Sequence, residues 1–117
     1  MLERFVPALA NRDFRGLETC FHDKARFRAL IPPGLREALG PAEAVAHLRR
    51  WFGNADVIEI ITSEVEDLGR RSSVAYRLRV RENSDWFVVE QRAFCTLEDG
   101  KIAAMDLLCS GFMREGE

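Results

Sequence analysis

The sequence has no apolar stretch long enough to cross a bilayer and no cluster of basic residues. A membrane-spanning helix needs roughly 20 consecutive apolar residues, and no run in this chain approaches that length. Residues Met1 to Pro7 also lack the long apolar core of a signal peptide. Lysine and arginine total 17 against 19 acidic residues, with no basic tail. We therefore expect neither a membrane nor nucleic acid among the partners.

Histidine and cysteine, the common metal ligands, are also scarce. The chain has two histidines and three cysteines, and no pair of them has the spacing of a metal site. We therefore expect no metal and no cofactor. The cysteines are odd in number, and each lies in an apolar run, which is typical of reduced core residues in a cytoplasmic protein.

What the chain does contain is sufficient for one well-packed domain. Its 117 residues are 47% hydrophobic and 31% charged, which is ordinary for a globular protein. Eight phenylalanines and two tryptophans supply large apolar side chains for a core. The length predicts a single domain over residues 1–117.

Three helices are predicted in the first half of the chain. The first begins near Leu2, the second follows Asp13 as its N-cap, and the third opens at Gly40-Pro41. Their apolar faces are Leu2, Phe5, Val6 and Leu9; then Phe14, Leu17, Cys20 and Phe21; then Val45, Leu48 and Phe52, flanked by Trp51.

The strands predicted around and after these helices are long for so short a chain. They are Ala25 to Ile31, Leu35 to Leu39, Val57 to Leu68, Ser72 to Arg81, Trp86 to Leu97 and Lys101 to Phe112. The order is helix, helix, hairpin, helix and then four antiparallel strands, so the predicted class is α+β.

Four short segments together resemble the nuclear-transport-factor-two-like superfamily, in particular its SnoaL-like branch. They are Asn11-Arg-Asp-Phe, His22-Asp-Lys-Ala-Arg-Phe, Pro33-Gly with Gly40-Pro-Ala-Glu-Ala-Val, and Leu97-Glu-Asp-Gly-Lys-Ile. The resemblance covers nearly the whole chain and implies a cone, in which a curved mixed or antiparallel sheet wraps three N-terminal helices. It also implies a pocket on the concave face and a homodimer formed through the convex face. It says little about activity, because this fold hosts unrelated functions.

Turn lengths predict which side chains share a face of the last three strands. A two-residue turn at Asn83-Ser84 or Ser84-Asp85 places the apolar alternate residues of the two flanking strands on the concave side. A three-residue loop, Glu98-Asp-Gly100, would continue that set with Ala103 and Met105 and place Asp106 opposite Arg92 on the convex side. If the loop had two residues, Asp106 would face inward.

The resulting concave wall is mostly hydrocarbon and sulfur, with Tyr76 and Gln91 as its polar groups. Such a wall suits an apolar small molecule oriented by a few hydrogen bonds. It equally suits a core that is simply filled. The predicted pocket residues are Trp51, Tyr76, Leu78, Val80, Phe87, Val89, Gln91, Met105, Leu107 and Cys109.

Catalytic residues are not evident. Ketosteroid isomerase, which this chain resembles in layout, uses a carboxylate base and an oxyanion hole made of a tyrosine and a protonated acid. By that resemblance the base, tyrosine and acid positions fall on Ala29, Phe5 and Ala93, and none of these side chains can act. Asp106 and His22 are the remaining acid–base candidates. Each also has a structural interpretation, Asp106 in a surface ion pair and His22 at a helix end.

Three functions follow in order of preference. The first is a small-molecule-binding domain with an apolar pocket. The second is a SnoaL-like isomerase, cyclase or hydrolase that uses Asp106 or His22. The third is a scaffold or regulatory dimerisation module with a filled core.

Overall fold

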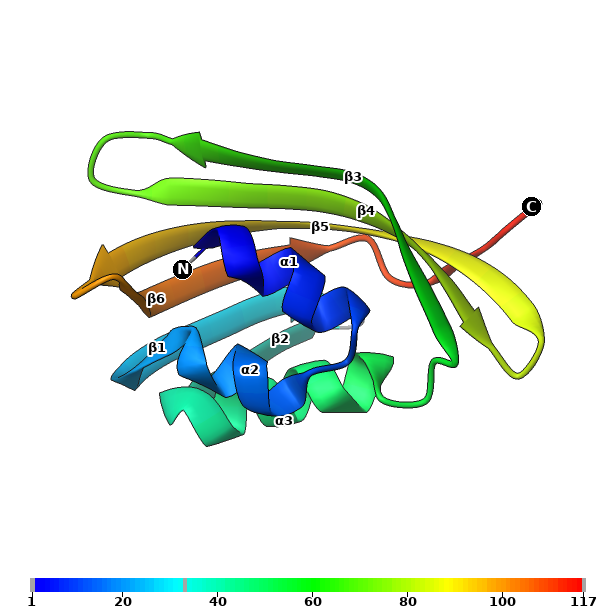
Figure 1. Ribbon diagram of the computed structural model, residues 1–117, viewed down its shortest axis with the longest axis horizontal. Coiled ribbons are helices and arrows are strands. Elements are labelled where there is room, and N and C mark those ends of the chain that lie inside the picture. The colour runs from blue at the N-terminus through cyan, green and yellow to red at the C-terminus, as the bar shows by residue number, and fades with distance from the viewer. Residues whose placement is uncertain (1, 33, 117) are drawn as a thin grey trace.

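In the computed structural model, three helices lie against one face of a curved, seven-stranded mixed sheet (Figure 1). The structure describes residues 2–32 and 34–116. The helices are α1 (Leu2–Ala10), α2 (Phe14–Thr19) and α3 (Gly40–Phe52). The strands are β1 (Phe21–Ile31), β2 (Gly34–Leu39), β3 (Val57–Asp67), β4 (Ser72–Glu82), β5 (Asp85–Glu98), β6 (Lys101–Cys109) and β7 (Met113–Arg114). This confirms the predicted α+β cone.

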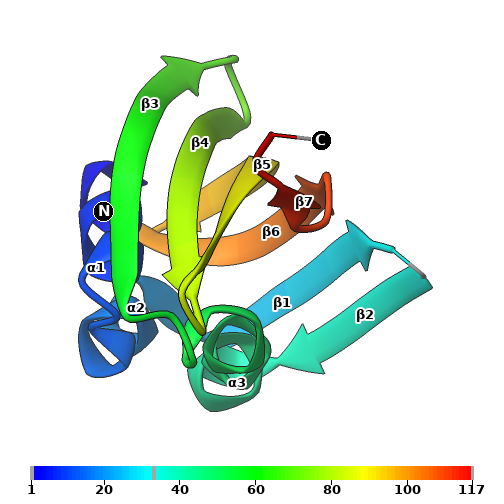
Figure 2. The ribbon, with the colours of Figure 1, turned by 90° about the vertical axis from the view of Figure 1, so that its right-hand side faces the viewer.

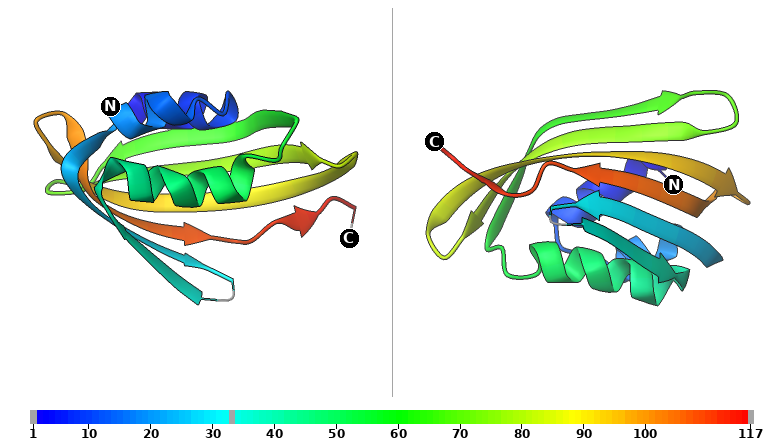
Figure 3. Two further views of the ribbon diagram at one scale, coloured as in Figure 1. Left: turned by 90° about the horizontal axis from the view of Figure 1, so that it is seen from below. Right: turned by 180° about the vertical axis from the view of Figure 1, so that it is seen from behind.

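The order of strands across the sheet is β2-β1-β6-β5-β4-β3, and β7 pairs with β5. All neighbouring pairs are antiparallel except β1 and β6, which run parallel. Figure 2 shows the sheet turning across its width, from upright β3 and β4 to inclined β1 and β2. The helices cover only one face, here called the inner face; the opposite or outer face carries no helix (Figure 3).

The inner face is apolar because side chains alternate along each strand. Phe27 on β1, Leu78 on β4 and Met105 on β6 are fully buried there. The predicted faces of the helices pack against them, with Phe5, Leu17 and Leu48 also fully buried. α3 lies on β1 and β2, α2 on α3, and α1 reaches β3.

The second helix ends sooner than predicted. Asp13 is its N-cap, as expected, and its carboxylate accepts a hydrogen bond from Gly16 N at 2.9 Å. The helix then stops at Thr19, and Phe21 begins β1 instead of continuing the helical face. Both placements bury Phe21, so the apolar pattern alone could not distinguish them.

The β4–β5 hairpin has the predicted register. Asn83 and Ser84 form a two-residue turn with φ of 53° and 68°, which matches the right-handed twist of the strands. Tyr76 stands opposite Gln91, and Leu78 opposite Val89.

The β5–β6 loop differs from the prediction. It has two residues, Asp99 and Gly100, with φ of 54° and 78°. The extra residue is inserted later, at a bulge that leaves Ala103 without a partner between the pairs Leu97–Ile102 and Thr96–Ala104. An added residue in the loop or in the strand has the same effect on alternation. Met105 and Leu107 therefore face inward as predicted, although Asp106 stands opposite Phe94 and not Arg92.

The last predicted strand is shorter than expected. β6 ends at Cys109, and Gly111 adopts a positive φ of 81°. The chain then resumes pairing with β5 through β7, where Val88 stands opposite Met113. This break turns Phe112 toward Phe52 and Phe87, with ring centroids 5.4 and 6.2 Å away.

The positive φ of Gly100 predicts a measurable cost of adding a side chain. A Cβ there would meet no atom within 4 Å, so Gly100→Ala isolates backbone strain, which costs about 1 kcal/mol for a non-glycine residue in the left-handed region. We expect that loss in the free energy of unfolding by urea titration. Gly34→Ala is the matched control, because its φ lies outside the left-handed range, and it should leave stability unchanged. Equal losses in both variants would contradict the turn assignment.

Candidate functional site

The predicted pocket residues occupy two different environments. Seven of them face inward but are at most 3% exposed, packed in the continuous core formed with the helices: Tyr76, Leu78, Val80, Val89, Gln91, Met105 and Leu107. Trp51, Phe87 and Cys109 are only partly buried, at the margin of that core. The deep interior is therefore largely filled by protein side chains.

The polar groups of the interior bond to one another. The Tyr76 hydroxyl donates to Gln91 Oε1 at 2.5 Å, and Gln91 Nε2 donates to Cys109 Sγ at 3.2 Å. Phe5 packs against the Tyr76 ring with centroids 6.1 Å apart. Burial raises the pKa of Tyr76 well above its ordinary value, so the phenol stays protonated and acts as a donor. The two polar groups that were predicted for the concave wall therefore bond to each other.

The buried cysteines are poorly suited to nucleophilic chemistry. Burial raises the pKa of Cys95 to about 12, and burial also raises the pKa of Cys20. A thiol acts as a nucleophile through its thiolate, and these two remain protonated at neutral pH.

An open cleft, here called the mouth cleft, lies at the end of the cone where the β4–β5 turn projects, on the right of Figure 1. It encloses about 540 Å³, within the usual range of small-molecule sites. Its lining residues are Ile31, Pro32, Trp51, Glu82, Asn83, Asp85, Phe87, Gly111, Phe112 and Arg114. It contains two of the predicted pocket residues, Trp51 and Phe87.

Hydrogen bonds and an ion pair hold the segment after β6 in place on both sides of the point where its strand pairing is interrupted. Ser110 N donates to the Glu90 carbonyl and Ser110 Oγ accepts from Glu90 N, each at 2.9 Å. Beyond β7, Glu115 N donates to the Trp86 carbonyl at 2.9 Å, and the Glu115 carboxylate pairs with Arg79 at 2.7 Å. These contacts fix Phe112 and Arg114 at the mouth cleft.

Most of the cleft residues were not among the predicted pocket residues. The alternation of the strands could have indicated two of them. Glu82 and Asp85 continue the inward-facing positions of Val80 and Phe87 and stand opposite each other at the turn. Phe112 and Arg114 had no such indication, because their positions depend on the break at residues 110–112.

The two acid–base candidates lie away from the mouth cleft. Asp106 is on the outer face, where it pairs with Arg28 and Arg71, each at 2.7 Å. Its outward position agrees with the bulged register, but the predicted partner, Arg92, was wrong because Asp106 stands opposite Phe94, two residues further along β5. The hydrogen bond from Arg28, with help from Arg71 and against the effect of burial, lowers the pKa of Asp106 below its ordinary value.

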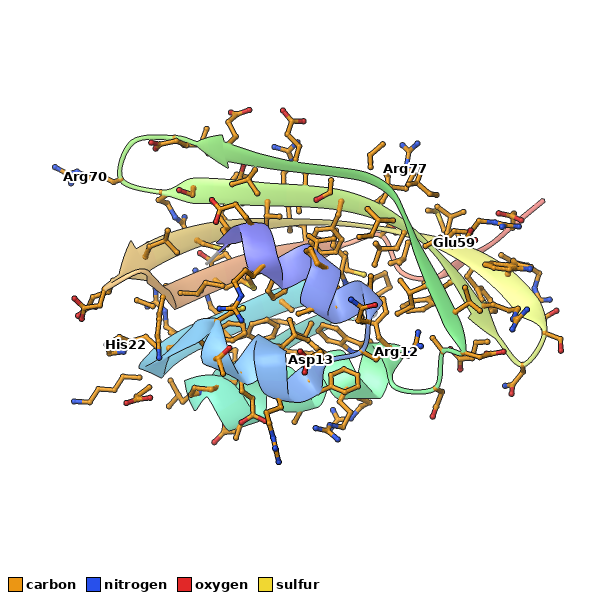
Figure 4. The ribbon with its side chains drawn as sticks, in the orientation of Figure 1. Arg12, Asp13, His22, Glu59, Arg70 and Arg77 are labelled. Carbon is orange, nitrogen blue, oxygen red and sulfur yellow. The ribbon has the colours of Figure 1, made fainter. Side chains whose placement is uncertain are left out.

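His22 lies near the start of β1, at the opposite end of the sheet from the β4–β5 turn (Figure 4). Its Nδ1 accepts a hydrogen bond from Lys24 N at 3.2 Å. Ligand atoms of His22, Glu98 and Asp99 lie within 4.8 Å of one another. The two carboxylates are exposed, and such groups are common without an ion, so we assign no metal to them.

Among the described residues, the fully buried interior is poor in groups for acid–base catalysis. Phe5, Ala29 and Ala93, at the positions that the ketosteroid isomerase resemblance assigns to catalysis, are buried core residues. The buried polar side chains, apart from cysteine, are those of Ser73, Tyr76 and Gln91. No carboxylate or imidazole is among them.

The outer face carries a lattice of ion pairs. Glu90 pairs with Arg77. Arg79 bridges Glu59 at 3.1 Å and Glu115 at 2.7 Å, and its guanidinium lies 3.8 Å from the centre of the Trp86 ring. The arginines that alternate along β4 are therefore accounted for by ion pairs at the surface.

The model of the SnoaL-like domain family matches residues 2–105 of the chain. A search of curated proteins finds no significant match. Among the described residues, no helix is long and apolar enough to cross a membrane.

Similar solved structures share the fold at low sequence identity. An LEH-like epoxide hydrolase of M. tuberculosis is 17% identical, with a TM-score of 0.68 over 92% of this chain and 78% of that one. Bal32a, from a soil-derived mobile gene cassette, is 13% identical, with a TM-score of 0.74 over 92% and 85%. A protein described as a SnoaL-like polyketide cyclase of Shewanella putrefaciens is 11% identical, with a TM-score of 0.70 over 91% and 84%.

The Asp106 ion pairs predict an acid-sensitive contribution to stability. Asp106→Asn should lower the free energy of unfolding by on the order of 1 kcal/mol at pH 7, since partly exposed pairs contribute little. Because the native pKa is lowered, the wild-type advantage is complete above the carboxyl's unfolded pKa of about 3.9. It is lost as the pH falls through the lower native value. Urea titrations of both proteins between pH 7 and pH 3 measure this difference, and a pH-independent difference would contradict the pairing.

Proposed function

The chain belongs to the SnoaL-like domain family, and we propose that it is a small-molecule-binding domain whose ligand occupies the mouth cleft. The observation that carries the proposal is the aromatic lining of an open cleft beside a filled interior. Trp51, Phe87 and Phe112 supply large apolar surfaces, and the adjoining core closes the cleft at its inner end. A ligand there would be held mainly by burial of its apolar body.

The enzyme alternative draws its support from the fold, whose members are isomerases, cyclases or hydrolases. Asp106 and His22 remain its candidates by residue type. Their positions favour structural roles, because Asp106 is held in two outer ion pairs and His22 lies at the far end of the sheet. Proteins of one fold carry different activities, so the family assignment does not by itself supply a reaction.

A scaffold or regulatory module is the second candidate function, favoured by the filled interior. Side chains such as Leu78, Val89 and Met105 are completely buried and leave little space for a deep ligand. This candidate and the binding domain differ at the mouth cleft, which a scaffold would not need.

We also propose that the protein is a homodimer through the outer face. Three leucines form a row across β2, β1 and β6, in which Leu30 stands beside both Leu35 and Leu108. Leu35, Leu30 and Leu108 are 54%, 53% and 49% exposed, respectively. Exposure of such an apolar row to water is unfavourable. The paired charges around them offer contacts of both signs to a second copy.

We place the protein in the cytoplasm as part of the same proposal. All three cysteines are free thiols, and Cys20 and Cys95 are buried in the core. Free core thiols agree with a reducing compartment.

Filling the mouth cleft should abolish binding. Ile31 points inward at the cleft and its neighbour Leu30 points outward, so Ile31→Trp and Leu30→Trp add the same ring on opposite faces of β1. Binding of 3-phenylpropanol would be measured by ligand-observed NMR. We expect it to bind the wild type and Leu30→Trp and not to bind Ile31→Trp. Equal binding to all three proteins, with circular dichroism confirming their folds, would place the ligand elsewhere.

A charge in the leucine row should separate the dimer. Leu108→Lys places an ammonium within the proposed interface, where it would be buried without a partner. Leu68→Lys, at the β3–β4 turn and 46% exposed, is the matched control. We expect a dimer mass for the wild type and the control and a monomer mass for Leu108→Lys by light scattering after size exclusion. A monomeric wild type would end this part of the proposal.

A further inference from the structure

We propose that the ligand of the mouth cleft carries a positive charge, as an amine or quaternary ammonium on an aromatic or branched alkyl body. This inference rests on the proposed function and specifies the class of ligand. It follows from the charges and aromatic rings that the β4–β5 turn and the segment after β6 bring together in the cleft.

Two carboxylates face the cleft from directly opposed positions. Glu82 and Asp85 close the β4–β5 hairpin as a cross-strand pair, and both continue the inward alternation that includes Val80 and Phe87. Like charges at opposed positions repel each other. An additional cation between or beside them would relieve that repulsion.

Among the described residues that line the cleft, Arg114 is the one cation, and of these two carboxylates it pairs with Asp85. Arg114 Nη1 lies 3.2 Å from Asp85 Oδ1. The Glu82 carboxylate has no hydrogen-bond or ion-pair partner among residues 2–32 and 34–116. The other lining residues are neutral, so the charged groups that face the cleft are two carboxylates and one guanidinium. The local excess of one negative charge favours a cationic ligand over an anionic one.

Arg114 also shows how a cation fits in this cleft. Its guanidinium carbon lies 5.5 Å from the centre of the Phe87 ring, a distance at which a cation and an aromatic face attract each other. Trp51 and Phe112 provide two further rings around the same space. A ligand ammonium near Glu82 would therefore find both a carboxylate and aromatic surfaces, while its apolar body covers the rest of the lining.

The size of the cleft limits the ligand to a small molecule. Its volume of about 540 Å³ lies in the range that takes compounds up to the size of a drug molecule. Three probes with one phenylpropyl body and different charges test the inference: 3-phenylpropylammonium, 3-phenylpropanol and 3-phenylpropionate. They differ at a single terminal group, so differences in affinity report the charge preference directly.

Trp51 can report binding if the second tryptophan is removed. In the full chain carrying Trp86→Phe, we would titrate each probe and follow the fluorescence of Trp51. We expect the ammonium to bind about tenfold more tightly than the alcohol and the carboxylate to bind most weakly. Added salt should reduce the advantage of the ammonium, because it screens charge.

Glu82→Gln tests the residue that carries the inference. It should bring the affinity of the ammonium close to that of the alcohol and leave the affinity of the alcohol unchanged. Glu66→Gln, on exposed β3, is the matched control and should keep the tenfold preference. Thermal unfolding by circular dichroism should confirm that both variants are folded.

The outcomes separate this inference from the function on which it rests. If the alcohol binds as tightly as the ammonium, or if Glu82→Gln leaves the preference intact, the inference is overturned while the binding function stands. If none of the three probes binds, the proposed function fails and the inference fails with it.

Discussion

The register of the β4–β5–β6 meander decides which side chains these three strands present to each side of the sheet. Two tight turns and a single bulge at Ala103 align the alternate residues of the three strands. Apolar side chains consequently face the helices and charged side chains face away. A shift of one residue in β6 would turn Asp106 into the core and Met105 out of it, and the cost of burying an unpaired carboxylate makes that alternative unfavourable.

The same register separates the interior from the mouth cleft. Inward positions along the middle of β4 and β5 belong to one buried cluster with side chains of α1 and α3, and they are filled by Leu78, Val89 and their neighbours. The inward positions at the turn, Glu82 and Asp85, lie past the covered part of the sheet. The break after β6 then folds Phe112 back over this end. A cleft therefore forms where the helices stop covering the sheet, and its residues are partly exposed for the same reason.

Much of the fold could be predicted from the sequence because local rules and burial agree. Alternation in β4 and β5 and the turn at Asn83-Ser84 predicted that Tyr76 and Gln91 both face the concave side. The bulge could not be located, since an extra residue in the loop or in the strand gives the same alternation, and the partner of Asp106 was therefore wrong. The start of β1 at Phe21 was missed because the helix and the strand both bury that ring. The cleft was mostly missed because it depends on long-range closure by residues 110–116, which no local pattern encodes.

A filled interior and a ligand in the mouth cleft can be distinguished from a ligand inside the cone by a methyl NMR titration. The protein would be labelled at isoleucine, leucine and valine and titrated with 3-phenylpropylammonium. We expect large shift changes at Ile31, which lines the cleft, and small changes at Leu78 and Val89, which are buried in the core. Large changes at Leu78 and Val89 with an unaffected Ile31 would instead show that the cone opens to admit the ligand into its interior and that the mouth cleft is not the binding site.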